Sequence, residues 1–149
     1  MDMTDEELVD FASAMSAFES KHFATAMGML SPFAEKGNQE AQHRMAIMYQ
    51  NGLGCAQNDT AALKWMTAAA ESGFAIAQHG LGFMYMEGEC VAKDINEAIK
   101  WFKKAAEQGL VGSQTTLAMM YHEGNGVEKD LTEAKKWYDM AGFTDMDLG

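Results

Sequence analysis

Basic residues are scarce in this sequence. Eleven lysines and arginines stand against 22 aspartates and glutamates, which gives a formal net charge of -11 and a pI near 4.6. A surface of this sign repels phosphate groups, so the composition argues against a nucleic-acid partner. Proline is also rare, with one residue, while 48% of the residues are hydrophobic. This apolar content is enough for a single folded domain and argues against disorder.

Long hydrophobic runs are missing as well. No apolar stretch approaches the roughly 20 residues that cross a membrane. The N-terminal segment, MDMTDEELVD, is acidic and lacks the basic head and the apolar run of a secretory signal. We therefore expect a cytoplasmic protein that does not associate with a membrane.

A period of 36 residues runs through most of the chain. Within each period the apolar residues recur every three or four positions, as in Ala77, Leu81 and Tyr85, which predicts helices. Periods in this range are typical of repeat architectures, and helical units favour a solenoid. The period superimposes three tyrosines, three glycines and three tryptophans: Tyr49, Tyr85 and Tyr121; Gly52, Gly88 and Gly124; Trp65, Trp101 and Trp137.

Capping residues predict where the helices of one unit begin and end. Asp94 and Glu97 have the spacing of a capping box at the start of a second helix, and the same pair recurs 36 residues later. Glycines such as Gly88 and Gly109 follow the first and second helices, where a left-handed residue can end a helix. Each unit is therefore predicted to be helix, loop, helix and glycine.

These residues resemble the Sel-1-like repeat family, a relative of the tetratricopeptide repeat. Its units read approximately A-x-x-x-L-G-x-x-Y-x-x-G-x-G-V-x-x-D-x-x-x-A-x-x-W-x-x-x-A-A-x-x-G, and the resemblance covers residues 41–142. It implies an all-α fold, an alpha-alpha superhelix or right-handed solenoid of about four helix-turn-helix repeats. We expect one domain over residues 1–149. Its parts are a divergent N-terminal hairpin at 4–37, repeats at 41–73, 77–109 and 113–142, and a tail at 143–149.

The resemblance implies a non-catalytic adaptor or scaffold, often in bacterial signalling or secretion-related pathways. Such a module has no cofactor and binds a partner protein or peptide in its concave groove. Two further modes of binding stay open, which are docking as a structural subunit through the C-terminal end and self-association.

A hydrolase is the alternative from a different class, since penicillin-binding or lactamase activity has been attached to some cysteine-rich relatives of the family. That chemistry needs an activated nucleophile. The sequence contains neither S-x-x-K nor G-x-S-x-G, and none of its serines has a lysine or histidine at a suggestive offset. We therefore expect no enzymatic activity.

Other residues that often carry chemistry have a structural explanation here. The tryptophans recur at one position of every second helix, which favours a role in the core. Cys55 and Cys90 lie in loops of neighbouring repeats, too far apart for a disulfide, so we predict free thiols. No two histidines have the i, i+4 spacing that binds zinc, so no metal site is predicted.

The predicted binding surface lies on the first helices. At 100° per residue, position 47 lies nearly opposite the side that packs on the second helices. Stacked repeats would align such positions into the floor of a groove, in which methionines give an adaptable surface. The alternative is that they pack against the adjacent first helix as core. The apolar positions are Ile47, Phe83 and Met119, and they are flanked by His43, Gln50, His79, Met86 and His122.

The C-terminal end is a second candidate interface. No repeat follows the last helix, so we expect the outer side of Trp137 and Tyr138 to be uncovered and the tail to be too short to cap it. Exposed contiguous apolar surface usually marks an association site. The sequence therefore predicts weak dimerisation or partner docking at this end.

Overall fold

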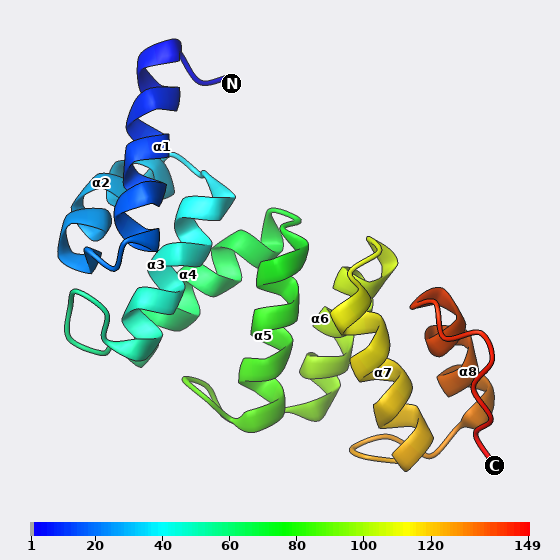
Figure 1. Ribbon diagram of the computed structural model, residues 1–149. Helices are drawn as coiled ribbons and strands as arrows, with labels where there is room; N and C mark the ends of the chain where they lie inside the picture. The colour runs from blue at the N-terminus through cyan, green and yellow to red at the C-terminus, as the bar shows by residue number, and fades with distance from the viewer. Residues whose placement is uncertain (1) are drawn as a thin grey trace. The chain divides into compact units, whose positions relative to one another are not determined.

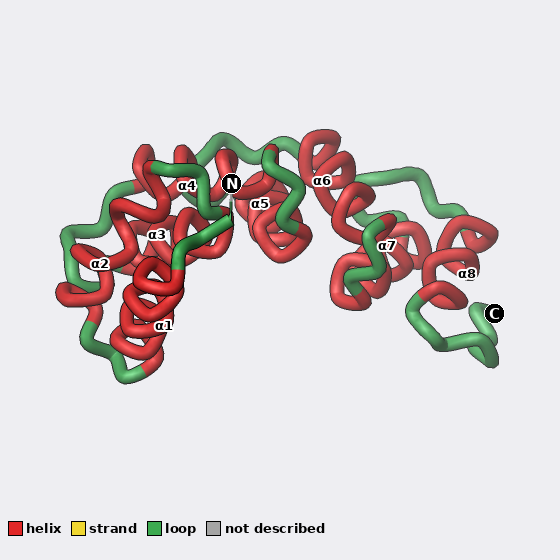
Figure 2. Tube along the Cα trace, turned by 90° about the horizontal axis from the view of Figure 1, so that it is seen from above, coloured by secondary structure: helices red, strands yellow, loops and turns green. Residues whose placement is uncertain are grey.

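The computed structural model describes residues 2–149, which form eight helices and no strand (Figures 1 and 2). The predicted all-α fold built from about four helix-turn-helix pairs is confirmed. The chain forms two compact units, of which the first ends at Ser72 and the second runs from Gly73 to Gly149.

The first unit contains two helical hairpins. The N-terminal hairpin consists of α1 (Asp5–Glu19) and α2 (Phe23–Glu35), and the next consists of α3 (Gln39–Asn51) and α4 (Asp59–Glu71). Small and flexible apolar residues fill the space between α1, α2 and α3. The core of this unit includes Ala14, Ala26, Leu30, Phe33, Met45 and Met48.

The second unit repeats this construction. Its hairpins are α5 (Ala75–Glu87) with α6 (Ile95–Glu107), and α7 (Val111–Glu123) with α8 (Leu131–Met140). One core cluster joins α6, α7 and α8, and it includes Ala98, Phe102, Leu117, Ala118, Trp137 and Tyr138. The tryptophan ladder is buried here, since Trp101 and Trp137 are 6% and 3% exposed, whereas Trp65 of the first unit is only half-buried.

The predicted cap acceptors are present, whereas the backbone N–H of Asp94 donates to the carbonyl oxygen of Tyr85 at 2.9 Å and not to the reciprocal glutamate of a capping box. The side chain of Asp94 accepts a hydrogen bond from the backbone N–H of Glu97 at 3.1 Å, and Asp130 accepts one from Glu133 at 3.0 Å. The first helices α5 and α7 end at Gly88 and Gly124, both left-handed with φ of 69°. These contacts satisfy backbone groups that a helix end leaves unpaired, and they fix where the loops begin.

Two contacts position α5 and α7 on α6, the helix that lies between them in the sequence. The buried side-chain amide of Gln114 donates to the carbonyl oxygen of Ala106 at 3.0 Å, which ties the start of α7 to the end of α6. On the other side, Gly82 lets α5 approach the fully buried ring of Phe102. Close packing of both first helices on α6 leaves their opposite sides at the surface.

Candidate protein-binding face

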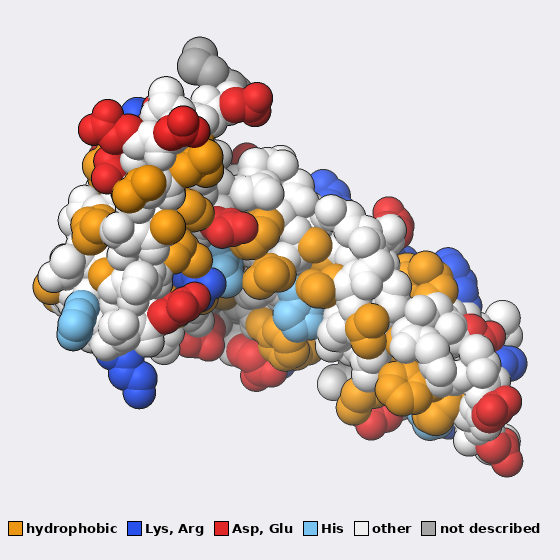
Figure 3. Space-filling view, turned by 45° about the horizontal axis from the view of Figure 1, so that its top comes forward, with side chains coloured by type: hydrophobic (Ala, Val, Ile, Leu, Met, Phe, Trp, Pro, Cys, Tyr) orange, Lys and Arg blue, Asp and Glu red, His pale blue; other side chains and the backbone are white. Residues whose placement is uncertain are grey.

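Four large apolar side chains of α5 and α7 are exposed. Ile76 and Phe83 of α5 are 50% and 39% exposed, and Val111 and Met119 of α7 are 52% and 47% exposed. Ile76 and Phe83 are seven residues apart and share one side of α5, while Val111 and Met119 lie within a quarter turn of each other on α7. We call these four residues the α5/α7 face. In the space-filling view, hydrophobic and histidine side chains lie next to one another on the surface (Figure 3).

The helices of this face are almost free of charge. Neither α5 nor α7 contains Asp, Glu, Lys or Arg before its last residue, which is Glu87 in α5 and Glu123 in α7. The second helices α6 and α8 carry the charges instead, including three lysines in α6. A surface helix normally turns a polar or charged side to solvent. The outward sides of α5 and α7 are thus unusual for surface that only meets water.

His79 holds the two helices of the face together. Its Nδ1 is hydrogen-bonded to the hydroxyl oxygen of Ser113 on α7, at 2.6 Å. A side chain built at Gly112 would lie 3.7 Å from the imidazole, so the start of α7 passes beside the ring. Burial lowers the pKa of His79, which favours the neutral imidazole at neutral pH.

Phe83 lies partly in the core and partly on the surface. Its ring packs edge-on against His79 and Phe102, with centroids 4.9 and 5.3 Å apart. At the same time 39% of the residue is exposed. Phe83 therefore has both the exposure that the groove hypothesis needs and the packing that the core hypothesis needs. Met119 is more exposed, so a substitution there tests binding at the surface more directly.

The remaining predicted binding residues are less exposed. Met86 is half-buried and packs against the core cluster of the second unit, and the His122 ring lies edge-on to Tyr138 with centroids 6.1 Å apart. His43, Ile47 and Gln50 lie half-buried on α3 of the first unit. A continuous stripe that joins them to Phe83 and Met119 stays a prediction.

The half-buried His43 also has a lowered pKa. Burial, together with the positive charge of Arg44, lowers the pKa of His43 from 6.5 to about 4. Both effects disfavour the imidazolium form. The residue is therefore neutral at physiological pH, and it contributes apolar and hydrogen-bonding surface and no positive charge.

Sequence reasoning missed two parts of this site. Ile76 and Val111 lie outside the predicted stripe, although the lack of charge along both helices would have indicated them. The pairing of Ser113 with His79 was also missed, because the two residues are 34 positions apart and no motif links them. Ser113 is fully buried, so its hydroxyl is not accessible to a substrate.

The expectation of an uncovered C-terminal end is wrong in detail. Trp137 and Tyr138 are only 3% and 6% exposed. The tail after α8 folds back, so that Phe143 packs edge-on against Tyr138 and Leu148 packs against the core cluster. Seven residues suffice because the backbone N–H of Phe143 donates to the carbonyl oxygen of Tyr138, which turns the chain back at the end of the helix.

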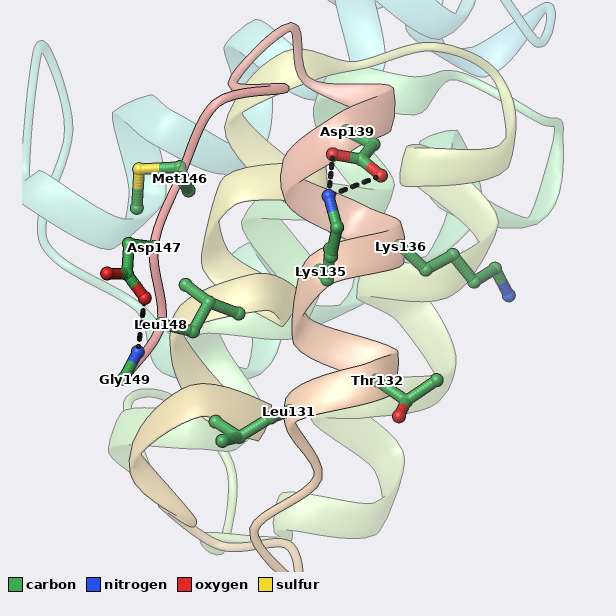
Figure 4. A pocket seen from close by; sticks show the side chains of 9 residues that line it. All are labelled: Leu131, Thr132, Lys135, Lys136, Asp139, Met146, Asp147, Leu148 and Gly149. Carbon is green, nitrogen blue, oxygen red and sulfur yellow. Dashed lines mark hydrogen bonds and ion pairs between the residues drawn. The ribbon is translucent and has the colours of Figure 1, made fainter.

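A shallow cavity of about 560 Å³ lies between this tail and α8 (Figure 4). Its charged residues include Lys135 and Asp139, whose side chains are paired at 3.1 and 3.2 Å on the surface of α8. Lys136 points away from the tail in the same view. Exposed pairs of this kind contribute little to stability and do not form a reaction centre.

Other candidate chemistry has no support within residues 2–149. No three His, Cys, Asp or Glu side chains in this range lie close enough together to hold a metal ion. None of the helices described is both long and apolar enough to span a bilayer. Cys55 and Cys90 do not form a disulfide with each other, and burial raises the pKa of the Cys55 thiol.

The family model described as Sel1 repeat matches three segments of the chain, residues 39–74, 75–110 and 112–142. A solved Sel1 repeat protein from Oxalobacter formigenes is 34% identical, with a TM-score of 0.82 over 88% of this chain and 54% of its own. A protective antigen of uropathogenic Escherichia coli strains that displays an SLR fold is 32% identical, with a TM-score of 0.79 over 97% of this chain and 34% of its own.

A third solved structure, cysteine rich protein B of Helicobacter pylori, is similar in fold alone, with 21% identity and a TM-score of 0.57 over 76% of this chain and 90% of its own. No curated protein matches the sequence. The chain spans about half the length of the first solved structure and about a third of the second.

Proposed function

Because the chain belongs to the Sel1 repeat family, we propose that it is a non-catalytic module that binds a partner protein or peptide on its α5/α7 face. Sel1 repeat proteins are generally protein-interaction modules. The observation that carries the proposal is the exposure of Ile76, Phe83, Val111 and Met119 on two helices that lack charge up to their last residue.

Exposure of this kind is costly for a surface that only meets water. Each large apolar side chain would gain about 1.5–3 kcal/mol on full burial, so four half-exposed ones retain several kcal/mol that a partner can release. The side chain of His79 links α5 to α7 and to the core, because it is hydrogen-bonded to Ser113 and packs against Phe102. A preformed apolar surface loses little conformational entropy on binding, which favours affinity.

Site-specific photocrosslinking tests the proposal. A photoreactive phenylalanine analogue at position 119 is compared with the same analogue at position 100, an exposed lysine of α6 on the charged surface. We expect one protein from the source organism to crosslink at position 119 and not at position 100. The purified partner should then lose at least about tenfold in affinity, about 1.4 kcal/mol, for the Met119→Glu variant. Equal crosslinking at both positions, or binding that ignores Met119→Glu, would contradict the proposal.

The hydrolase alternative has one structural point in its favour, the hydrogen bond between Ser113 and His79. Nucleophilic catalysis needs the serine hydroxyl to reach a substrate carbonyl, and Ser113 is 0% exposed. A chromogenic lactam assay on the pure chain and on Ser113→Ala separates the functions. We expect no turnover by either protein, and turnover that Ser113→Ala abolishes would favour the hydrolase.

A further inference from the structure

We propose that the segment bound by the α5/α7 face is apolar and carries a cluster of lysine or arginine residues that lies over the carboxyl-terminal ends of α5 and α7. This inference rests on the proposed function and adds the chemistry and the direction of the bound segment. It follows from where the charges of the second unit lie.

The carboxyl-terminal ends of α5 and α7 lie at the same edge of the second unit. The two helices run in the same direction, and each ends in a loop at that edge (Figure 1). The hydrogen bond between His79 and Ser113 joins their amino-terminal halves, which agrees with this parallel arrangement. Whatever the two loops carry is therefore presented together at one end of the face.

Both loops are acidic. Together with the last residue of each helix they contain six carboxylates against two lysines, so this edge accounts for a net charge of -4. The same edge holds the carboxyl-terminal ends of α5 and α7 and the amino-terminal ends of α6 and α8, whose partial charges have opposite signs, so its net negative charge comes from the side chains. The carboxylates belong to Glu87, Glu89, Asp94, Glu123, Glu128 and Asp130, and the lysines are Lys93 and Lys129.

No fixed charge on the face itself balances this edge. The lysines of α6 and α8 lie over aromatic rings or pair with carboxylates of their own helices: Lys100 and Lys104 over Trp101, Lys136 over Trp137, Lys103 over Tyr121, and Lys135 with Asp139. A bound segment thus meets an uncharged apolar surface followed by a concentrated negative one. Basic residues at that end of the segment gain attraction, whereas acidic residues there are repelled.

The test is a selection from a random peptide library displayed on phage, with the whole chain as bait. Peptides that bind are synthesised with a fluorophore, and their affinity is measured by fluorescence anisotropy. We expect selected peptides to combine large apolar residues with lysines or arginines clustered at one end. Their affinity should fall severalfold or more when salt is raised from about 0.05 M to about 0.5 M, because screening weakens exposed charge pairs.

Charge reversal at the acidic edge provides the specific variant. The double variant Glu87→Lys and Glu123→Lys should lower the affinity of the selected peptides about tenfold or more. It should leave the fold intact, because a lysine at the carboxyl-terminal end of a helix is favourable. The matched control is Glu71→Lys with Glu107→Lys. It makes the same change of charge at the last residues of α4 and α6 and should change affinity less than about twofold.

The outcomes separate this inference from the proposed function. One outcome would overturn the inferred partner chemistry and leave the α5/α7 face as the binding site. In that outcome the selected peptides lack basic residues, bind the charge-reversed variant as tightly as the original protein, and lose affinity for the Met119→Glu variant. Selected peptides whose affinity is the same for Met119→Glu as for the original protein would overturn both the α5/α7 face and the inferred partner chemistry. Recovery of no binding peptide would overturn the partner chemistry, while crosslinking from position 119 continues to test the face itself.

Discussion

The substitution Gly82→Ala tests how closely α5 packs on α6, the contact that supports the α5/α7 face. A Cβ atom at position 82 would lie 2.7 and 2.8 Å from two ring atoms of Phe102. Real Cβ atoms essentially never approach so closely, and Phe102 is 0% exposed, so its ring has no free space into which to move. Either the ring leaves its rotamer or α5 moves away from α6.

Two opposing effects set the magnitude. Alanine favours the middle of a helix over glycine by about 1 kcal/mol. Overpacking of a close-packed core costs about 1–3 kcal/mol. We therefore expect Gly82→Ala to lower the free energy of unfolding by about 1 kcal/mol, which corresponds to a melting temperature about 2–4 °C lower for a chain of this size.

The chain offers a matched control and a compensating change. Gly28 also lies inside a helix, α2, but a Cβ atom there meets nothing within 4 Å, so Gly28→Ala should stabilise the protein by about 0.5–1 kcal/mol. Residues 36 positions before Gly82 and Phe102 are Ala46 and Met66, which are both buried, so the equivalent positions of the preceding repeat hold an alanine with a methionine. Adding Phe102→Met to Gly82→Ala should therefore recover most of the lost stability.

Thermal and urea unfolding followed by circular dichroism give the measurement. The decisive comparison is the sign of the change in the free energy of unfolding, which should be negative for Gly82→Ala and positive for Gly28→Ala. If Gly82→Ala stabilises the protein as much as Gly28→Ala does, α5 does not pack on Phe102 as described. If the double variant is less stable than Gly82→Ala alone, steric overlap with the ring is not the cause.

Three further predictions concern the face, the histidines and the tail. Met119→Ser should change the free energy of unfolding by less than about 0.5 kcal/mol, whereas Phe83→Ala should cost about 2 kcal/mol in urea unfolding because its ring also packs on Phe102. An equal cost for both would show that Met119 is core. Since the folded pKa of His43 is about 4 and its ordinary value is 6.5, the unfolded chain takes up the proton first, and stability should fall as pH decreases from 7 toward 4. His43→Gln should reduce that loss in melting experiments and His22→Gln, on an exposed residue, should not. Leu148→Ser should uncover the Trp137 and Tyr138 end, lower the melting temperature and increase self-association in sedimentation, while Met146→Ser, at an exposed position of the same tail, should do neither.

Most of the fold was predictable because the same local signals occur in each repeat. The acceptors at Asp94 and Asp130 mark the starts of α6 and α8 in the sequence, and the glycines at 88 and 124 mark the ends of α5 and α7. Each of these signals acts within four residues, so no knowledge of the tertiary structure is needed to interpret it.

The parts that were missed depend on contacts between distant residues. The tail contains turn-forming residues and has no helical pattern, so the packing of Leu148 on the last hairpin appears only in three dimensions. Phe83 illustrates the same limit, since helical periodicity places it opposite the second helices although its ring still contacts Phe102 of α6. Large side chains reach around a helix, and an angle of 100° per residue does not describe that reach.

The distribution of charge gives the most direct connection between this sequence and the function that we propose. A helix on a protein surface is normally amphipathic, and α6 and α8 follow this rule with lysines and glutamates outside and tryptophans inside. In α5 and α7 the packed side is formed by Leu81, Met84, Leu117 and Met120, while the outward side carries Ile76, Phe83 and Met119 in place of charges. The acidic loops place negative charge beside the face and add repulsion between copies without adding polarity to the face itself. An apolar outward side gains nothing from contact with water, and the negative charge along its border gives it the chemistry to bind the proposed apolar segment that ends in basic residues.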